Sequence, residues 1–175
     1  MIRFSVVFLL CVVSSYAIKV VDVDTICKNV NDNPPFCLNL LKSKNGTDLV
    51  TLAQYTITVA RIDLTTTVNV INKLISQSGS DLKAKDHYEY CLSLFGTGGG
   101  GALSLLGDGE QHLKNGDYDS FNVQVNSIIA DYSECIKGRT PGVPPYDDKS
   151  VLPKYAEVVH DVVDILSAIA LFLVD

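Results

Sequence analysis

The sequence predicts an all-α protein: an antiparallel four-helix bundle preceded by a short α-helical hairpin, with two disulfides. Apolar residues recur every three or four positions over long stretches, which is the helical period. Short Gly-, Pro- or Asn-containing segments separate these stretches, as expected for helices joined up and down in a bundle. The chain has 175 residues, of which 47% are hydrophobic and 19% charged. This composition fits one globular domain and excludes an intrinsically disordered chain.

Residues 1–17 have the layout of a secretory signal peptide. Arg3 gives a positive start, an apolar run extends from Phe4 to Val13, and Ser15 and Ala17 are small residues at the −3 and −1 positions. A membrane anchor is the alternative, but the run is too short to cross roughly 30 Å of hydrocarbon. We therefore expect a secreted, extracellular protein of residues 18–175, with no membrane association after cleavage.

The charge balance limits the partners. The net charge is −6, and removal of Arg3 with the signal peptide makes it −7. Nucleic acid is excluded as a partner, because binding it needs clustered Lys and Arg. A basic protein partner fits better.

Four cysteines remain once Cys11 leaves with the signal peptide: Cys27, Cys37, Cys91 and Cys135. An even number in an exported chain indicates disulfides, and four cysteines allow three pairings. Sequential pairing would close loops of 11 and 45 residues. A zinc site is the competing explanation, but the sequence has no Cys-x-x-Cys to support it.

The first part of the mature chain, residues 22–46, predicts the hairpin. Its apolar pattern is broken by Pro34-Pro35, so we expect two short helices with a turn between them. Asn45-Gly46-Thr47 is a glycosylation sequon in a polar stretch, which makes Asn45 the expected glycosylation site in a surface loop.

Residues 47–175 predict the bundle. Threonines are dense in residues 47–78 and would suit a strand, but the apolar period extends over about 30 residues, far longer than strands in small domains. Thr47 or Asp48 can cap this helix. The next helix, 81–113, starts after a Ser80-Asp81 cap and contains the glycine run Gly98–Gly101, which should break or bulge it. Helices follow at 119–137, after an Asn115-Gly116-Asp117 stop, and at 150–174, where the pattern assigns Tyr155 and Val158 to the buried face.

Signals for catalysis are weak, and we expect no enzyme and no cofactor. Gly96, Gly98 and Gly101 satisfy G-x-G-x-x-G, but the run follows a helix rather than a strand. His87, His112 and His160 lie on separate helices without a second ligand three or four residues away, so solvated or cap-side histidines are expected rather than metal ligands.

The cysteines and their flanks resemble a known family. Ile26-Cys27 and Pro35-Phe36-Cys37 are similar to the N-terminal hairpin of the plant invertase and pectin methylesterase inhibitors. The likeness continues through residues 48–60, 88–91 and 114–122 to Cys135. This resemblance implies a four-helix bundle with the sequential disulfides Cys27–Cys37 and Cys91–Cys135, no catalysis, and an extracellular protein in the plant cell wall.

The resemblance also implies a function. Such proteins bind a cell-wall enzyme one to one and sterically block its active-site cleft. Gly116-Asp117-Tyr118 is similar to the pectin methylesterase inhibitors, whereas invertase inhibitors usually carry Pro-Lys-Phe after Gly-Asp. The expected partner is therefore a pectin methylesterase, with cell-wall or vacuolar invertase as the alternative and a non-inhibitory storage protein or receptor ligand as further possibilities. The expected contact residues on the helices at 47–78, 81–113 and 119–137 are Asp63, Thr67, Lys85, Glu89, Asp131 and Glu134.

Overall fold

The structure, a computed structural model, describes residues 19–138 and 145–175. The predicted signal peptide at 1–17 lies outside these residues. Every regular element described is helical, and the only other pairing is an isolated bridge between Val20 and Asp48. The elements are α1 (Val23–Cys27), α2 (Pro34–Leu41), the 3-10 turn η1 (Lys42–Lys44), α3 (Leu49–Gln77), α4 (Leu82–Phe95), α5 (Ala102–Lys114), α6 (Tyr118–Lys137) and α7 (Leu152–Val174).

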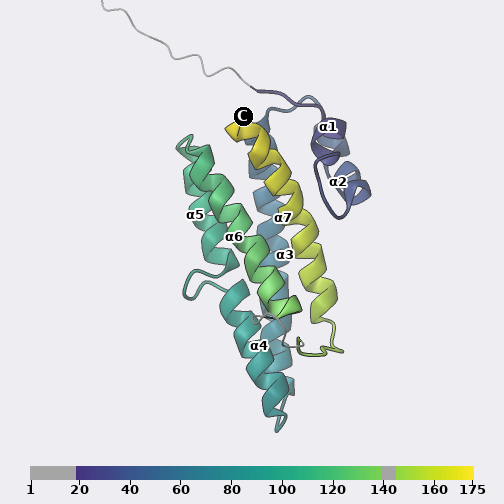
Figure 1. Ribbon diagram of the computed structural model, residues 1–175, viewed down its shortest axis with the longest axis vertical. Coiled ribbons are helices and arrows are strands. Elements are labelled where there is room, and N and C mark those ends of the chain that lie inside the picture. Colours follow the sequence, from purple (N-terminus) through teal and green to yellow (C-terminus); the bar gives the residue numbers. More distant parts are fainter. Residues whose placement is uncertain (1–18, 139–144) are drawn as a thin grey trace, which may run out of the picture.

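The long helices form the predicted bundle. α3, α6 and α7 run along the long axis of the molecule, and α4 followed by α5 occupies the fourth position (Figure 1). α3 packs against α7 and α4, and α6 packs against α5 and α7. The glycine run breaks the second helix into α4 and α5, as expected. None of the described helices is both long and apolar enough to cross a membrane.

Aspartates fix the starts of three bundle helices. The side chains of Asp48, Asp81 and Asp117 accept hydrogen bonds from backbone N–H groups in the first turns of α3, α4 and α6, at 2.9, 3.1 and 3.2 Å. Such caps satisfy donors that have no partner inside the helix. Before α6 the stop is completed by Gly116, whose φ of +73° allows the chain to leave α5. The caps predicted at these three positions are confirmed.

The threonines of α3 are compatible with a helix because their hydroxyls form hydrogen bonds with the backbone of the same helix. The hydroxyls of Thr56, Thr58, Thr65 and Thr66 donate to the backbone carbonyl four residues earlier, at 2.7–2.9 Å. This bond supplies the partner that a hydroxyl would otherwise seek outside the helix. Residues 49–77 therefore form a helix, and the strand alternative for this segment is excluded.

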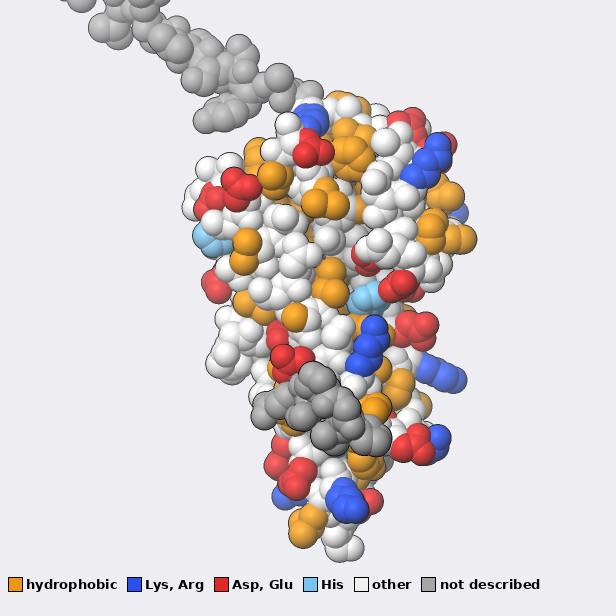
Figure 2. Space-filling view, in the orientation of Figure 1, with side chains coloured by type: hydrophobic (Ala, Val, Ile, Leu, Met, Phe, Trp, Pro, Cys, Tyr) orange, Lys and Arg blue, Asp and Glu red, His pale blue; other side chains and the backbone are white. Residues whose placement is uncertain are grey.

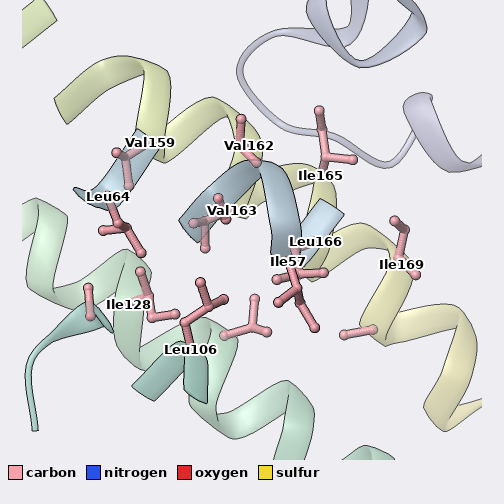
Figure 3. Close-up of a cluster of buried hydrophobic side chains, with 14 of the residues drawn as sticks. Ile57, Leu64, Leu106, Ile128, Val159, Val162, Val163, Ile165, Leu166 and Ile169 are labelled. Atoms are coloured by element: carbon pink, nitrogen blue, oxygen red, sulfur yellow. The ribbon is translucent and has the colours of Figure 1, made fainter. Parts of the chain in front are cut away.

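Apolar side chains from all four positions of the bundle meet in the core (Figure 3). Ile57 and Leu64 of α3, Leu106 of α5 and Ile128 of α6 face a nearly continuous apolar surface of α7. The prediction for α7 was wrong in one respect. Tyr155 and Val158 are 40% and 42% exposed, and the neighbouring Ala156 and Val159 are buried instead. α7 is apolar on most sides, so the period alone could not select its buried face.

The N-terminal hairpin is held by a disulfide and by a buried carboxylate. The predicted bond between Cys27 and Cys37 joins α1 to α2, and the bond between Cys91 and Cys135 joins α4 to α6. Asp164 of α7 is 4% exposed. It accepts hydrogen bonds from the backbone N–H of Asn31 at 2.8 Å, the side-chain amide of Asn31 at 3.1 Å and the backbone N–H of Asp32 at 3.3 Å. This carboxylate therefore fixes the α1–α2 turn on α7.

An ion-pair group joins α3 to α5. Glu110 lies 2.6 Å from Arg61 of α3 and 2.6 Å from Lys114, one turn further along α5. The hydrogen bond from Lys114 and the charge of Lys114, followed by the charge of Arg61, lower the pKa of Glu110 below its ordinary value. The charges are partly exposed, so the group contributes modestly to stability.

Candidate partner-binding site

The glycine run forms a compact loop between α4 and α5, which we call the glycine loop (residues 96–101). Gly99 and Gly100 have φ of +62° and +91°, a conformation that L side chains rarely adopt. A Cβ on Gly101 would lie 2.6 Å from the carbonyl oxygen of Ser93 and 2.7 Å from that of Gly96. The loop thus folds back on the end of α4, and only glycine fits at its last position.

The glycine loop forms one wall of a surface hollow of about 390 Å³. Tyr90, Ser93 and Leu94 of α4 form a second wall, and Asp131 and Glu134 of α6 form the third. We call this site the acidic hollow. The structure brings the predicted residues Asp131 and Glu134 together here, because they lie three positions apart on one face of α6.

The two carboxylates of the acidic hollow differ in environment. Glu134 is exposed and accepts a hydrogen bond from the hydroxyl of Tyr90. Asp131 is half-buried, and its Oδ2 atom is buried without a hydrogen-bond partner in the protein. Burial, together with the negative charge of Glu134, raises the pKa of Asp131 to about 6. The charge of the hollow therefore changes between mildly acidic and neutral pH.

The remaining predicted contact residues lie on α3 and α4. Lys85 and Glu89 are one turn apart on α4 and form an ion pair at 3.8 Å. Asp63 of α3 is half-buried, and burial raises its pKa above the ordinary value. Thr67 is fully buried, and its hydroxyl donates to the carbonyl of Asp63 at 2.8 Å. Thr67 thus lies beneath the surface of the free protein, whereas the other five side chains reach it.

The expectation of solvated histidines was wrong for two of the three. The side chains of His87 and His160 are only 11% and 13% exposed. His87 stacks on Tyr146 with ring centroids 4.5 Å apart, and His160 lies against Tyr132 at 4.3 Å. Burial lowers the pKa of His87, and the nearby Asp148 carboxylate opposes that shift. These contacts could not be predicted from local sequence patterns, because the partners lie about 60 and 30 residues away in the chain.

Charged side chains are spread over the surface. On the face shown in Figure 2, acidic and basic groups are interspersed and form no continuous patch of one sign. This face therefore presents no broad electrostatic field of one sign. Asn45 is exposed after η1, and its glycosylation stays a prediction.

In architecture the protein is a disulfide-bonded helical bundle with an N-terminal hairpin. The sequence profile described as "Plant invertase/pectin methylesterase inhibitor" matches residues 21–169. The chain is 30% identical over 133 residues to pectinesterase inhibitor 1 of Arabidopsis thaliana, covering 75% of this chain and 72% of that protein. It is 31% identical over 106 residues to the pectinesterase inhibitor of Actinidia deliciosa, covering 59% and 55%.

The fold is similar to solved structures of the same kind. A mutant form of a pectin methylesterase inhibitor from Arabidopsis superposes with a TM-score of 0.68 at 25% identity, covering 85% of this chain and 94% of that one. The protein belongs to the plant invertase/pectin methylesterase inhibitor family, whose members are non-catalytic inhibitors. The family implies a target enzyme, either a pectin methylesterase or an invertase.

Proposed function

We propose that this protein is an extracellular inhibitor of pectin methylesterase that forms a 1:1 complex and blocks the active-site cleft. Two relatives, 30% and 31% identical to this chain over 133 and 106 aligned residues, are named pectinesterase inhibitors. Gly116-Asp117-Tyr118, at the stop between α5 and α6, supports the same target over invertase.

The observation that carries the proposal is the acidic hollow. It lies where α4, the glycine loop and α6 meet, and it holds a half-buried carboxylate without a hydrogen-bond partner at Oδ2. Such a carboxylate is stabilised by a basic side chain that enters the hollow, because the new ion pair replaces a missing contact. The half-buried Asp63, the partly exposed Lys85 and the exposed Glu89 extend the proposed contact surface over α3 and α4.

The proposal predicts a pH dependence. With a pKa of about 6, Asp131 is mostly protonated at pH 5 and mostly ionised at pH 7. If the partner's basic group binds the ionised form, the affinity should rise up to about tenfold over this range. The net negative charge should also speed association at low salt.

The test is a parallel inhibition assay of the oxidised, purified protein against a plant pectin methylesterase and a plant cell-wall invertase. Asp131→Asn should weaken inhibition of the methylesterase at pH 7 and remove most of the difference between pH 5 and pH 7. Asp119→Asn is the matched control: it removes the same charge from the same helix, about 18 Å along the axis.

Each outcome decides a different part of the proposal. Inhibition of the invertase alone would refute the target. Inhibition of the methylesterase with equal effects of the two substitutions would refute the role of the acidic hollow. Inhibition of neither enzyme would overturn the function and leave the family membership intact.

A further inference from the structure

A second cluster of polar and sulfur-containing side chains lies where α4, α6 and the segment before α7 meet. His87 lies one turn before Cys91 on α4, and Cys91 is bonded to Cys135 of α6. The Nε2 atom of His87 is 3.8 Å from the Sγ atom of Cys91. The same nitrogen is 3.8 Å from the Oδ2 atom of Asp148. We call these four residues the His87 cluster.

The His87 cluster is buried and held in place. The side chains of His87 and Asp148 are 11% and 6% exposed. The Oδ1 atom of Asp148 accepts hydrogen bonds from the hydroxyl of Tyr88 at 2.9 Å and from the backbone N–H of Ser150 at 2.8 Å. The Oδ2 atom is buried without a hydrogen-bond partner. A buried carboxylate oxygen without a donor is costly, so it points to a cation that could satisfy it.

The spacing of the donor atoms matches a metal site. The His87 nitrogen and the two sulfurs lie within 4.8 Å of one another. In a tetrahedral zinc site, bond lengths of about 2.3 Å to sulfur and 2.0 Å to nitrogen place two sulfurs about 3.8 Å apart and a sulfur and a nitrogen about 3.5 Å apart. Only the two sulfurs, joined in the disulfide, are too close together. No second group of three such side chains occurs in residues 19–138 and 145–175.

We propose that reduction of the Cys91–Cys135 disulfide converts the His87 cluster into a Zn²⁺ site, with Cys91, Cys135 and His87 as ligands and Asp148 in the fourth position. A dithiol supplies two electrons and two protons, is itself oxidised to a disulfide, and leaves two cysteine thiols. Both thiols then lose their protons to solvent, and the two thiolates bind Zn²⁺ together with the imidazole and the carboxylate.

The chemistry selects zinc over harder cations. Thiolate and imidazole ligands suit Zn²⁺, whereas Mg²⁺ and Ca²⁺ take oxygen ligands. The bound ion would replace the covalent bond between α4 and α6 and also hold the segment before α7 through Asp148. Metal binding would thus stabilise the folded form of the reduced chain, because metal binding and folding are coupled in such sites.

The experiment uses the full mature chain, reduced with a water-soluble phosphine and titrated with Co²⁺, which gives an absorption band when bound by thiolates. We expect one ion per chain, displaced by Zn²⁺. Cys91→Ser/Cys135→Ser should abolish the band, and Cys27→Ser/Cys37→Ser should retain it. His87→Gln and Asp148→Asn should each weaken binding by at least about tenfold. His112→Gln, which alters a partly exposed histidine on α5, should leave binding unchanged.

Folding is followed by circular dichroism in the same titration. If reduction unfolds the metal-free chain, recovery of helicity on adding Zn²⁺, absent in the Cys91→Ser/Cys135→Ser variant, supports the site. A band of equal strength in that variant would show binding by the other cysteines and overturn the proposal. Absence of any band, or equal affinity in His87→Gln, would overturn it too.

Discussion

The carboxylate of Asp164 offers the sharpest test of how the hairpin is held, through the substitution Asp164→Ala. Three donors from the α1–α2 turn lose their acceptor. Hydrogen bonds to a charged group contribute about 1.5–3 kcal/mol each, but these three share one acceptor, and Asn31 and Asp32 lie where water can reach them. We therefore expect the free energy of unfolding to fall by about 2–4 kcal/mol.

The assay is chemical and thermal unfolding of the oxidised protein, together with amide hydrogen exchange. A loss of this size should lower the melting temperature by about 5–15 °C. Exchange should accelerate at Asn31 and Asp32, while the disulfide keeps α1 and α2 joined. The matched control is Asp147→Ala, an aspartate whose side chain is 81% exposed, with an expected change below about 0.5 kcal/mol. If both variants unfold alike and exchange at the turn is unchanged, the reasoning is refuted.

Three further predictions concern the glycine loop and two acids. Gly101→Ala should lower the free energy of unfolding by about 1–3 kcal/mol, because the added Cβ would press on backbone carbonyls. Gly107→Ala in α5, where the added Cβ would meet no heavy atom within 4 Å, should raise it by about 0.5–1 kcal/mol. Both changes are measured in the same denaturant titration. Glu110→Gln should lower the free energy of unfolding by about 0.5–1 kcal/mol at pH 7. Because the pKa of Glu110 is depressed in the folded state, the unfolding curves of the wild type and the variant should converge as the pH falls below the ordinary value of 4.5. A difference that persists in acid would contradict the ion-pair explanation. Asp131→Asn should raise the free energy of unfolding by about 1–2 kcal/mol above pH 6 and leave it unchanged below pH 4. The reason is that the raised pKa of Asp131 makes its ionised form destabilising in the folded state. A loss of stability in the variant at pH 7 would contradict this.

Local rules in the sequence predicted most of the fold. The apolar period and the aspartate caps located α3, α4 and α6 to within a few residues, because both depend on neighbours in the chain. The resemblance supplied the disulfide pairing, which cysteine spacing alone left open among three choices. The glycine run was correctly expected to break the second helix, since four glycines together cannot sustain one.

Contacts between distant segments could not be predicted in this way. Thr67 was assigned to the surface because it is polar, but its hydroxyl bonds within α3 and frees it to be buried. Asp164 and Asp148 look like ordinary surface acids in the sequence, and their burial depends on donors from other elements. Asp131 and Glu134 share one helix face, as their spacing requires, and their contact with a partner stays a prediction. The wall that the glycine loop provides beside them is visible only in the structure.

The glycine loop also shows where this bundle can grow. α3 rises about 44 Å over its 29 residues, and the 14 residues of α4 with the 13 of α5 rise about 40 Å. The two shorter helices therefore span nearly the whole partner helix by themselves, and the six residues between them add almost no length along the bundle. Extra residues in this position leave the registry of α5 against α6 unchanged, so a change in the length of the loop at Gly98–Gly100 reshapes the wall of the acidic hollow without moving the helices of the bundle.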